Sequence, residues 1–156
     1  MSILHLVIVF FVSMVPLIEL RGAVPIGVGL GLPEWLTLII AIIGNMIPVP
    51  FIFLFSRKFL EWGAKKKWKP LNKFCNWCLK KGEKAGKKLQ NSKSAYIGLL
   101  FFVGIPLPGT GAWTGTLAAS FLDLNFKKTI FAVMGGVLLA GIIMLAISLG
   151  VFGVVR

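Results

Sequence analysis

The sequence predicts an all-α integral membrane protein made of two antiparallel, inverted-topology repeats. Hydrophobic residues make up 57% of the 156 positions, and the mean hydropathy is +0.90, well above that of soluble domains. Two short apolar runs are each broken by a proline- and glycine-rich motif, and a long apolar stretch follows each of them. We therefore expect each repeat to be a re-entrant helical hairpin followed by a transmembrane helix, within one membrane domain of residues 1–156.

The charge of the chain is concentrated in one segment. The net charge is +12, and residues 57–93 hold 13 of the 17 Lys and Arg residues but only two of the five acidic ones. A lysine-rich segment between apolar halves follows the positive-inside rule, which predicts a multi-pass protein of the cytoplasmic membrane with this segment in the cytoplasm. Anionic lipid headgroups are its expected partner. Nucleic acid is not expected, because no recognition helix or RNA-binding motif accompanies the charge.

The first repeat is expected at residues 1–56, beginning with a re-entrant hairpin at residues 3–32. Its first apolar run has about 13 residues, and a helix of that length rises only about 20 Å, less than a hydrocarbon core of about 30 Å. The motif Pro16–Gly27 then breaks the helix and brings Glu19 and Arg21 to the hairpin tip. Charges inside a membrane usually pair or line a wet cavity, so this motif is the leading functional candidate.

The first full span is expected at residues 35–55, which carry no charge and rise roughly 31 Å as a helix. Within it, Gly44-Asn45 and the prolines Pro48 and Pro50 predict a kink. These residues either form a notch for helix packing, or Asn45 and the freed carbonyls face the hairpin tips.

The basic connector is expected at residues 57–93. From Leu71 onward, apolar or small residues recur every three or four positions with lysines between them, which predicts an amphipathic helix on the membrane surface. The lysines expected to face lipid headgroups are Lys65, Lys66, Lys67, Lys73, Lys80, Lys81, Lys84, Lys87 and Lys88. Cys75 and Cys78 have no second pair of metal ligands nearby in the sequence, so we expect no metal, no redox role and no cofactor.

The second repeat is expected at residues 94–156, with a re-entrant hairpin at 94–122 and a span at 129–155. Its helix-breaking tip is Pro106–Gly111, and an offset of 89 residues superimposes this tip on the first one. With the connector in the cytoplasm, the second hairpin enters from the cytoplasm, so the repeats are antiparallel and their tips approach near the midplane. The competing interpretation has four full spans and both chain ends in the cytoplasm.

Both tips resemble those of a known family. The residues Glu-Leu-Arg-Gly-Ala-Val-Pro-Ile-Gly of Glu19–Gly27, Gly44-Asn45 with Pro48, and Pro-Leu-Pro-Gly-Thr-Gly-Ala-Trp-Thr-Gly of Pro106–Gly115 look like the putative small multidrug export protein family of small prokaryotic membrane proteins. This resemblance covers almost the whole chain and implies a transporter.

More distantly, the two hairpins resemble the DedA (VTT-domain) superfamily, whose members are implicated in moving lipids or undecaprenyl phosphate across bilayers with proton coupling. Glu19 matches the acidic residue on the first DedA hairpin. The DedA arginines lie on the second hairpin, whereas Arg21 lies on the first.

We expect a small, homodimeric, proton-coupled transporter of an amphiphile such as a phosphate-bearing lipid or lipid carrier. Arg21 would clamp the anion, because its planar fork matches phosphate oxygens, and Glu19 would carry the proton. Alternatively, the two form a salt bridge, with each other or between subunits, that only fixes the tip. The residues expected to bind substrate or couple transport are Glu19, Arg21, Gly22, Pro25, Asn45, Pro106, Pro108, Gly109, Thr110, Gly111, Trp113 and Thr114.

Within that set, the backbone N–H groups of Gly22, Gly109 and Gly111 are expected to form an anion nest. Trp113 is either an aromatic wall or ordinary packing. Two other functions stay open: a small multidrug or cation exporter, and a non-transporting scaffold that binds anionic lipids. An enzyme is not expected, because the single histidine, His5, lies near the chain start and no catalytic set or nucleotide loop is present.

Overall fold

The computed structural model describes residues 2–155, and the regular structure in that range is entirely helical, as predicted. Apolar side chains dominate every helix except the lysine-rich fifth. The eight helices are α1 (Ile3–Met14), α2 (Glu19–Gly29), α3 (Glu34–Met46), α4 (Pro48–Ala64), α5 (Lys69–Leu89), α6 (Lys93–Gly104), α7 (Ala112–Phe121) and α8 (Phe126–Val155).

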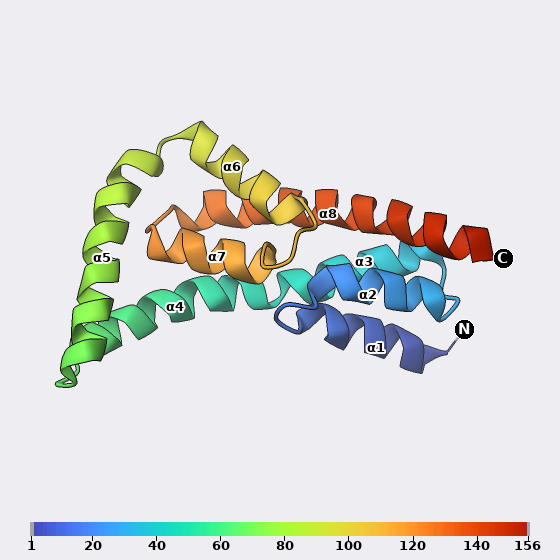
Figure 1. The fold of residues 1–156 in the computed structure, drawn as a ribbon, viewed down its shortest axis with the longest axis horizontal. Coiled ribbons are helices and arrows are strands. Elements are labelled where there is room, and N and C mark those ends of the chain that lie inside the picture. The colour runs from blue at the N-terminus through green and yellow to red at the C-terminus, as the bar shows by residue number, and fades with distance from the viewer. Residues whose placement is uncertain (1, 156) are drawn as a thin grey trace.

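Two helical hairpins enter the molecule from opposite ends. In Figure 1, α3, α4 and α8 run along the long axis, α1 and α2 form a hairpin at the end where the chain termini lie, and α6 and α7 form a hairpin at the other end. The turns of both hairpins lie near the middle of the long axis. Helix α5 crosses the far end at a steep angle to α4 and α8. Two segments distant in sequence, residues 15–18 and residues 105–111, are thereby brought together.

Two helical segments are long and apolar enough to cross a membrane. They are Glu34–Ala64, with 31 residues, and Phe126–Gly153, with 28 residues, and the most apolar 18-residue stretch of each has a mean hydropathy of 2.4 and 2.7, respectively. The first continues beyond the predicted end at residue 55, so the basic connector begins later than expected. It continues because Leu60 and Gly63 are buried, and Gly63 lies close against Cys75 of α5.

The first of these segments is interrupted at Ile47, between α3 and α4. Pro48 lacks an N–H group and cannot donate to the carbonyl four residues before it, which explains the break that Pro48 predicted. Gly44 is needed just before it, because a Cβ there would lie only 2.6 Å from the carbonyl oxygen of Phe10 in α1.

The first tip is shorter than predicted. The expected helix break at Pro16–Gly27 is confined to residues 15–18, and α2 runs helically through Gly22, Pro25 and Gly27. Gly27 serves packing rather than a turn, since a Cβ there would lie 3.0 Å from Cγ2 of Val9 and would overlap Thr37. Glu19 and Arg21 therefore lie in the first turn of a helix, not in an irregular loop.

The second tip is a true break, as predicted. Residues 105–111 are non-helical, and Gly109 has a φ of +79°, a left-handed conformation that glycine adopts without strain. The loop ends at Gly111, and α7 begins at Ala112. The start of α7 therefore faces the start of α2 across the junction of the two hairpins.

Candidate functional site at the junction of the two tips

Glu19 reaches from the first hairpin to the start of the second. Its side chain is almost fully buried, with 5% exposure. Oε2 accepts a hydrogen bond from the N–H of Ala112 and Oε1 accepts one from the N–H of Trp113, both at 3.0 Å. These are the first two N–H groups of α7, which have no partner within their own helix. The positive end of the helix dipole adds a favourable interaction with the carboxylate.

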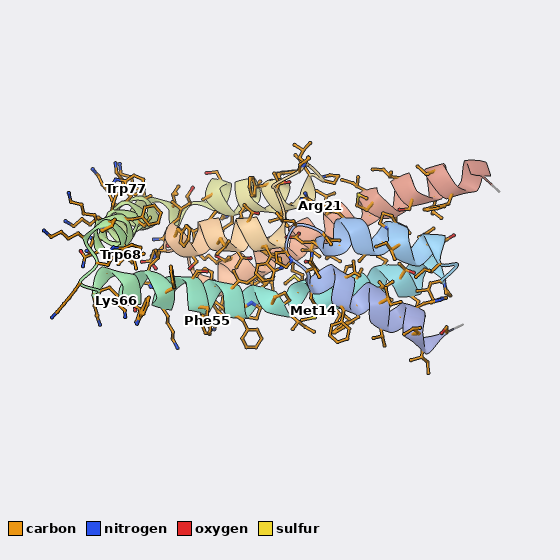
Figure 2. The ribbon with its side chains drawn as sticks, turned by 60° about the horizontal axis from the view of Figure 1, so that its bottom comes forward. Met14, Arg21, Phe55, Lys66, Trp68 and Trp77 are labelled. Carbon is orange, nitrogen blue, oxygen red and sulfur yellow. The ribbon has the colours of Figure 1, made fainter. Side chains whose placement is uncertain are left out.

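Arg21 makes the complementary contact with the second tip. Its guanidinium donates to the carbonyl oxygens of Leu107 and Ile105, the latter at 3.3 Å, and to Oγ1 of Thr110 at 2.8 Å. Thr110 Oγ1 in turn lies 2.9 Å from the same two carbonyl oxygens. In Figure 2, Arg21 lies near the middle of the long axis of the molecule. The first hairpin thus supplies both charges, and the uncharged second tip binds them largely through backbone groups.

The alternative of a direct Glu19–Arg21 salt bridge is wrong. Within residues 2–155, the ion pairs join Arg57 to Glu61 and to Asp123, and Glu19 and Arg21 are not paired with each other. Their side chains instead bind different parts of the second hairpin. A salt bridge was a reasonable expectation from two charges so close in sequence, but the sequence does not show that α7 presents free N–H groups there.

Asn45 lies beside these two residues, as one of the sequence interpretations required. It is 2% exposed, and it lines a cavity of about 10 Å³ with Glu19, Arg21 and Ala112. Its Oδ1 atom is buried without a hydrogen-bond partner. A cavity of this size is at the lower limit for one water molecule. In this conformation the junction has no room for a substrate.

The predicted anion nest is not formed as expected. The N–H of Gly22 donates to the carbonyl of Ile18 within the turn, and the α7 N–H groups that face the site belong to Ala112 and Trp113. Gly111 is required for a different reason: a Cβ there would lie 2.9 Å from Cδ of Glu19. The signal for this arrangement was the Gly-Ala-Trp sequence that opens a helix after a glycine-rich loop.

The other predicted site residues divide into two groups. Thr110 and Trp113 contact Arg21 and Glu19, as described above. Six others do not line the small cavity: Gly22, Pro25, Pro106, Pro108, Gly109 and Thr114. Of these, Pro106, Pro108 and Gly109 belong to the loop that Arg21 binds. The indole Nε1 of Trp113 is buried without a hydrogen-bond partner.

Comparison with known proteins supports the resemblance at the two tips. Residues 19–143 match the model of the family described as Putative small multi-drug export protein. The chain belongs to this family. The match begins at Glu19, directly after the turn of the first hairpin, and includes the whole second tip, and together with the two long apolar helices it identifies a membrane protein. No match was found among curated proteins or among solved structures.

In this small multi-drug export family member, a second polar contact was missed by sequence reasoning. Arg57 of α4 pairs with Asp123, at the turn between α7 and α8, and with Glu61 at 3.5 Å. Gln90 donates to the backbone carbonyl of Asp123 at 2.6 Å. These bonds fix the base of the second hairpin to α4 and to the end of α5. The sequence did not predict this pair, because Arg57 and Asp123 are 66 residues apart.

The basic end of this family member is built on α5. All nine lysines predicted to face lipid are exposed, and Lys66 lies 4.3 Å from the ring centroid of Trp62. Figure 2 shows Lys66, Trp68 and Trp77 together at the end of the molecule that α5 crosses. On its inner side, α5 places Gly82 and Gly86 directly against the backbone at the end of α7. The predicted amphipathic helix is therefore present, with its small residues facing the second hairpin.

Within residues 2–155, no three His, Cys, Asp or Glu side chains come close enough to hold an ion. Cys75 is buried and Cys78 is half-buried, and neither forms a disulfide.

Proposed function

We propose that this protein is a membrane transporter whose substrate site forms where the two hairpin tips meet. The observation that carries the proposal is the double contact of Glu19 with the α7 amides and of Arg21 with the second-tip carbonyls. The tips can separate only when both contacts break. Ionisable groups at membrane depth are typical of substrate and proton pathways, which fits the export function named in the family description.

The conformation described here is a closed one in this proposal. The cavity beside Glu19, Arg21 and Asn45 is about 10 Å³, far smaller than the 300–1,000 Å³ typical of ligand sites. Substrate entry therefore requires one hairpin to move away from the other. Because the hairpins come from opposite ends of the molecule, moving one and then the other would expose the site to each side in turn.

The proposal treats the two halves as inverted repeats, and matching hydrogen bonds support it. The helices α2 and α7 end in equivalent turns, where Gly31 and Asp123 both have positive φ. The equivalent bonds are Gly31 N–H to Val28 O and Leu32 N–H to Gly27 O in the first repeat, and Asp123 N–H to Ser120 O and Leu124 N–H to Ala119 O in the second. Each residue of the second set follows its counterpart by 92 positions.

The same offset relates glycines that let the hairpin helices approach the spans. Gly44 lies against the carbonyl oxygen of Phe10 in α1, and Gly136 lies against that of Leu100 in α6. Equivalent residues of the two repeats are therefore 90 positions apart before the hairpin tip and 92 positions apart after it. The sequence comparison had indicated a constant offset of 89 residues. A tip with two additional residues in the second repeat accounts for the difference.

Proton coupling in this mechanism would act through the α7 amides. A proton on Glu19 would cancel the charge that these two N–H groups stabilise and would weaken both hydrogen bonds. The freed N–H groups would then suit an anionic group of the substrate, and Arg21 would turn from the carbonyls to the same group. We therefore propose a phosphate-bearing lipid or lipid carrier as substrate. The distant DedA resemblance points the same way.

The export of drug cations is the second candidate, because the family description names it. A cation would pair with the Glu19 carboxylate. Arg21 lines the same small cavity and would repel a cation there, so we favour the anionic amphiphile. If the protein is instead a scaffold that binds anionic lipids through α5 without transport, its function should not depend on the side chain of Glu19 or of Arg21.

Transport by purified protein in vesicles at two pH values distinguishes these functions. Glu19→Gln and Arg21→Gln should each abolish transport of a fluorescent phosphate-bearing lipid, whereas Glu34→Gln, the same change at an exposed carboxylate, should have no effect. If both tip variants transport lipid and drug as well as the unaltered protein, the site is wrong. Transport of a drug cation alone would establish the second candidate.

For the membrane arrangement, we propose the cytoplasmic membrane, with α5 in the cytoplasm and both chain ends outside. A reporter fused after residue 156 tests this: a cytoplasmic reporter together with a cytoplasmic α5 would overturn the hairpin topology. We also propose a homodimer, because two spanning segments enclose little space and α4 exposes large aromatic side chains such as Phe51 and Phe55. Cross-linking in native membranes measures this directly.

A further inference from the structure

A groove lies between α6 and α8 near the basic end of the molecule, away from the tips. It has a volume of about 500 Å³ and is open along one side. The residues that carry the argument are Lys93, Tyr96, Ile97 and Leu100 of α6, and Lys128 and Phe131 of α8. In Figure 1 these two helices start close to α5 and run from there toward the middle of the molecule. The groove thus begins at the charged end and continues into the apolar region.

The mouth of the groove carries uncompensated positive charge. Lys93 and Lys128 are both exposed, and no Asp or Glu lines the groove. Lys128 is held near the mouth, because its Nζ lies 3.4 Å from the carbonyl oxygen of Gln90 and 5.7 Å from the ring centroid of Tyr96. The nearby carboxylate of Asp123 is already paired with Arg57. A ligand at the mouth is therefore expected to bring negative charge.

Beyond the mouth, the groove is lined by apolar side chains. Ile97 is 54% exposed and Phe131 is 72% exposed, and each follows its lysine by about one helical turn. Leu100 continues the apolar surface by a further turn. The change from charge to hydrocarbon thus takes place over roughly 5–10 Å along the helices. This polarity matches an amphiphile with an anionic head and an acyl chain, and neither a free phosphate nor an uncharged drug would use both parts.

We propose that this groove is a specific site for one anionic phospholipid, with the phosphate on Lys93 and Lys128 and an acyl chain along Ile97, Leu100 and Phe131. It differs from the α5 surface, whose lysines are spread over an exposed helix and would attract many headgroups without selecting one. It also differs from the tip junction, because binding here needs no movement of the hairpins. The proposal therefore stands or falls independently of transport.

Site-specific photo-cross-linking tests the proposal. A photoreactive amino acid placed at Phe131, and a control at Ile142 on the same helix, are compared in vesicles of equal parts phosphatidylglycerol and phosphatidylcholine. Ile142 is 61% exposed but lies about three turns farther from the basic end. Mass spectrometry of the cross-linked lipid should show a ratio of phosphatidylglycerol to phosphatidylcholine of about five at position 131 and about one, as in the bulk lipid, at position 142.

The matched variants locate the selecting charges. Lys93→Gln with Lys128→Gln should remove the enrichment at position 131, whereas Lys87→Gln with Lys88→Gln on α5 should leave it unchanged. Excess glycerol phosphate should not compete, because it lacks the acyl chain. Bulk lipid composition at position 131, enrichment that survives the Lys93 and Lys128 changes, or equal loss in the α5 variant would each overturn the proposal.

Discussion

Replacing Gly111 by alanine should break the contact between the two tips without touching either charge. The backbone of Gly111 is extended, with a φ of 160°, and alanine adopts that conformation without strain. A Cβ at this position would overlap Oε2 of Glu19 and would lie 2.9 Å from Cδ. The carboxylate sits at the end of a flexible side chain, so it would move aside. In doing so it would lose its hydrogen bonds to Ala112 and Trp113.

The size of the effect follows from those two bonds. A hydrogen bond to a charged group contributes about 1.5–3 kcal/mol, so losing one bond should lower the free energy of unfolding by about 1.5–3 kcal/mol and losing both by about 3–6 kcal/mol. Gly98→Ala is the matched control, because Gly98 lies inside α6 and a Cβ there meets no atom within 4 Å. Alanine is favoured over glycine inside a helix by about 0.5–1 kcal/mol, so this variant should be slightly more stable. Unfolding in lipid bicelles measures both.

A double-mutant cycle decides whether the Glu19 carboxylate is the cause. In a Glu19→Ala background, Gly111→Ala should cost less than about 1 kcal/mol, because only the smaller preference for glycine over alanine before a helix remains. If Gly111→Ala costs the same in both backgrounds, the carboxylate does not lie beside Gly111 and the proposed contact between the tips is refuted. The same conclusion follows if Gly111→Ala and Gly98→Ala have equal effects.

Three further predictions concern the basic end. Asp123→Asn, which tolerates the positive φ of this position, should lower the free energy of unfolding by about 1 kcal/mol by removing the half-exposed ion pair with Arg57, and a double-mutant cycle with Arg57→Gln should recover that coupling. Gly82→Ala should push α5 off the Phe121 carbonyl and speed maleimide labelling of the buried Cys75, whereas Gly150→Ala, which meets open space, should not. Burial, and then the neighbouring Cys75, raise the pKa of the Cys78 thiol above that of a free cysteine, so its labelling should rise with pH at more alkaline values than that of a free thiol.

Much of the fold could be predicted because it depends on local patterns. The length of an apolar run is enough to tell whether it can cross a membrane, and the spacing of the lysines identifies α5. Helix breaks were predicted less well. Pro16–Gly27 contains the glycines and proline expected of a loop, yet Gly27 is a packing contact to Val9 and Thr37, and the chain stays helical. Composition alone does not distinguish a glycine needed for a turn from one needed for close approach.

The candidate site was predicted by residue type but not by its contacts. Glu19 and Arg21 were identified because charge inside a membrane requires a partner, and one of the two interpretations of Asn45 placed it near them. Their partners, the Ala112 and Trp113 amides and the Leu107 carbonyl, are backbone groups about 86–94 residues away. Backbone groups carry no signature in the sequence, so the sequence offered only a substrate anion and a proton, or alternatively the other charge, as partners of these side chains. The Arg57–Asp123 pair was missed for the same reason of sequence distance.

The backbone of the first tip indicates which hairpin is poised to move. Leu17 and Glu19 have φ values of 74° and 51°, conformations that cost non-glycine residues roughly 1–2 kcal/mol each. The two charge-assisted bonds of Glu19 contribute about 3–6 kcal/mol, enough to offset that strain. Two neutral hydrogen bonds contribute only about 1 kcal/mol each, which barely offsets the backbone strain. A proton on Glu19 would therefore leave the contact of the first tip only marginally stable. The second tip has its positive φ at Gly109, where no such strain arises. The proposed proton step therefore releases the first hairpin, and the movement of the second hairpin would belong to the other half of the proposed cycle.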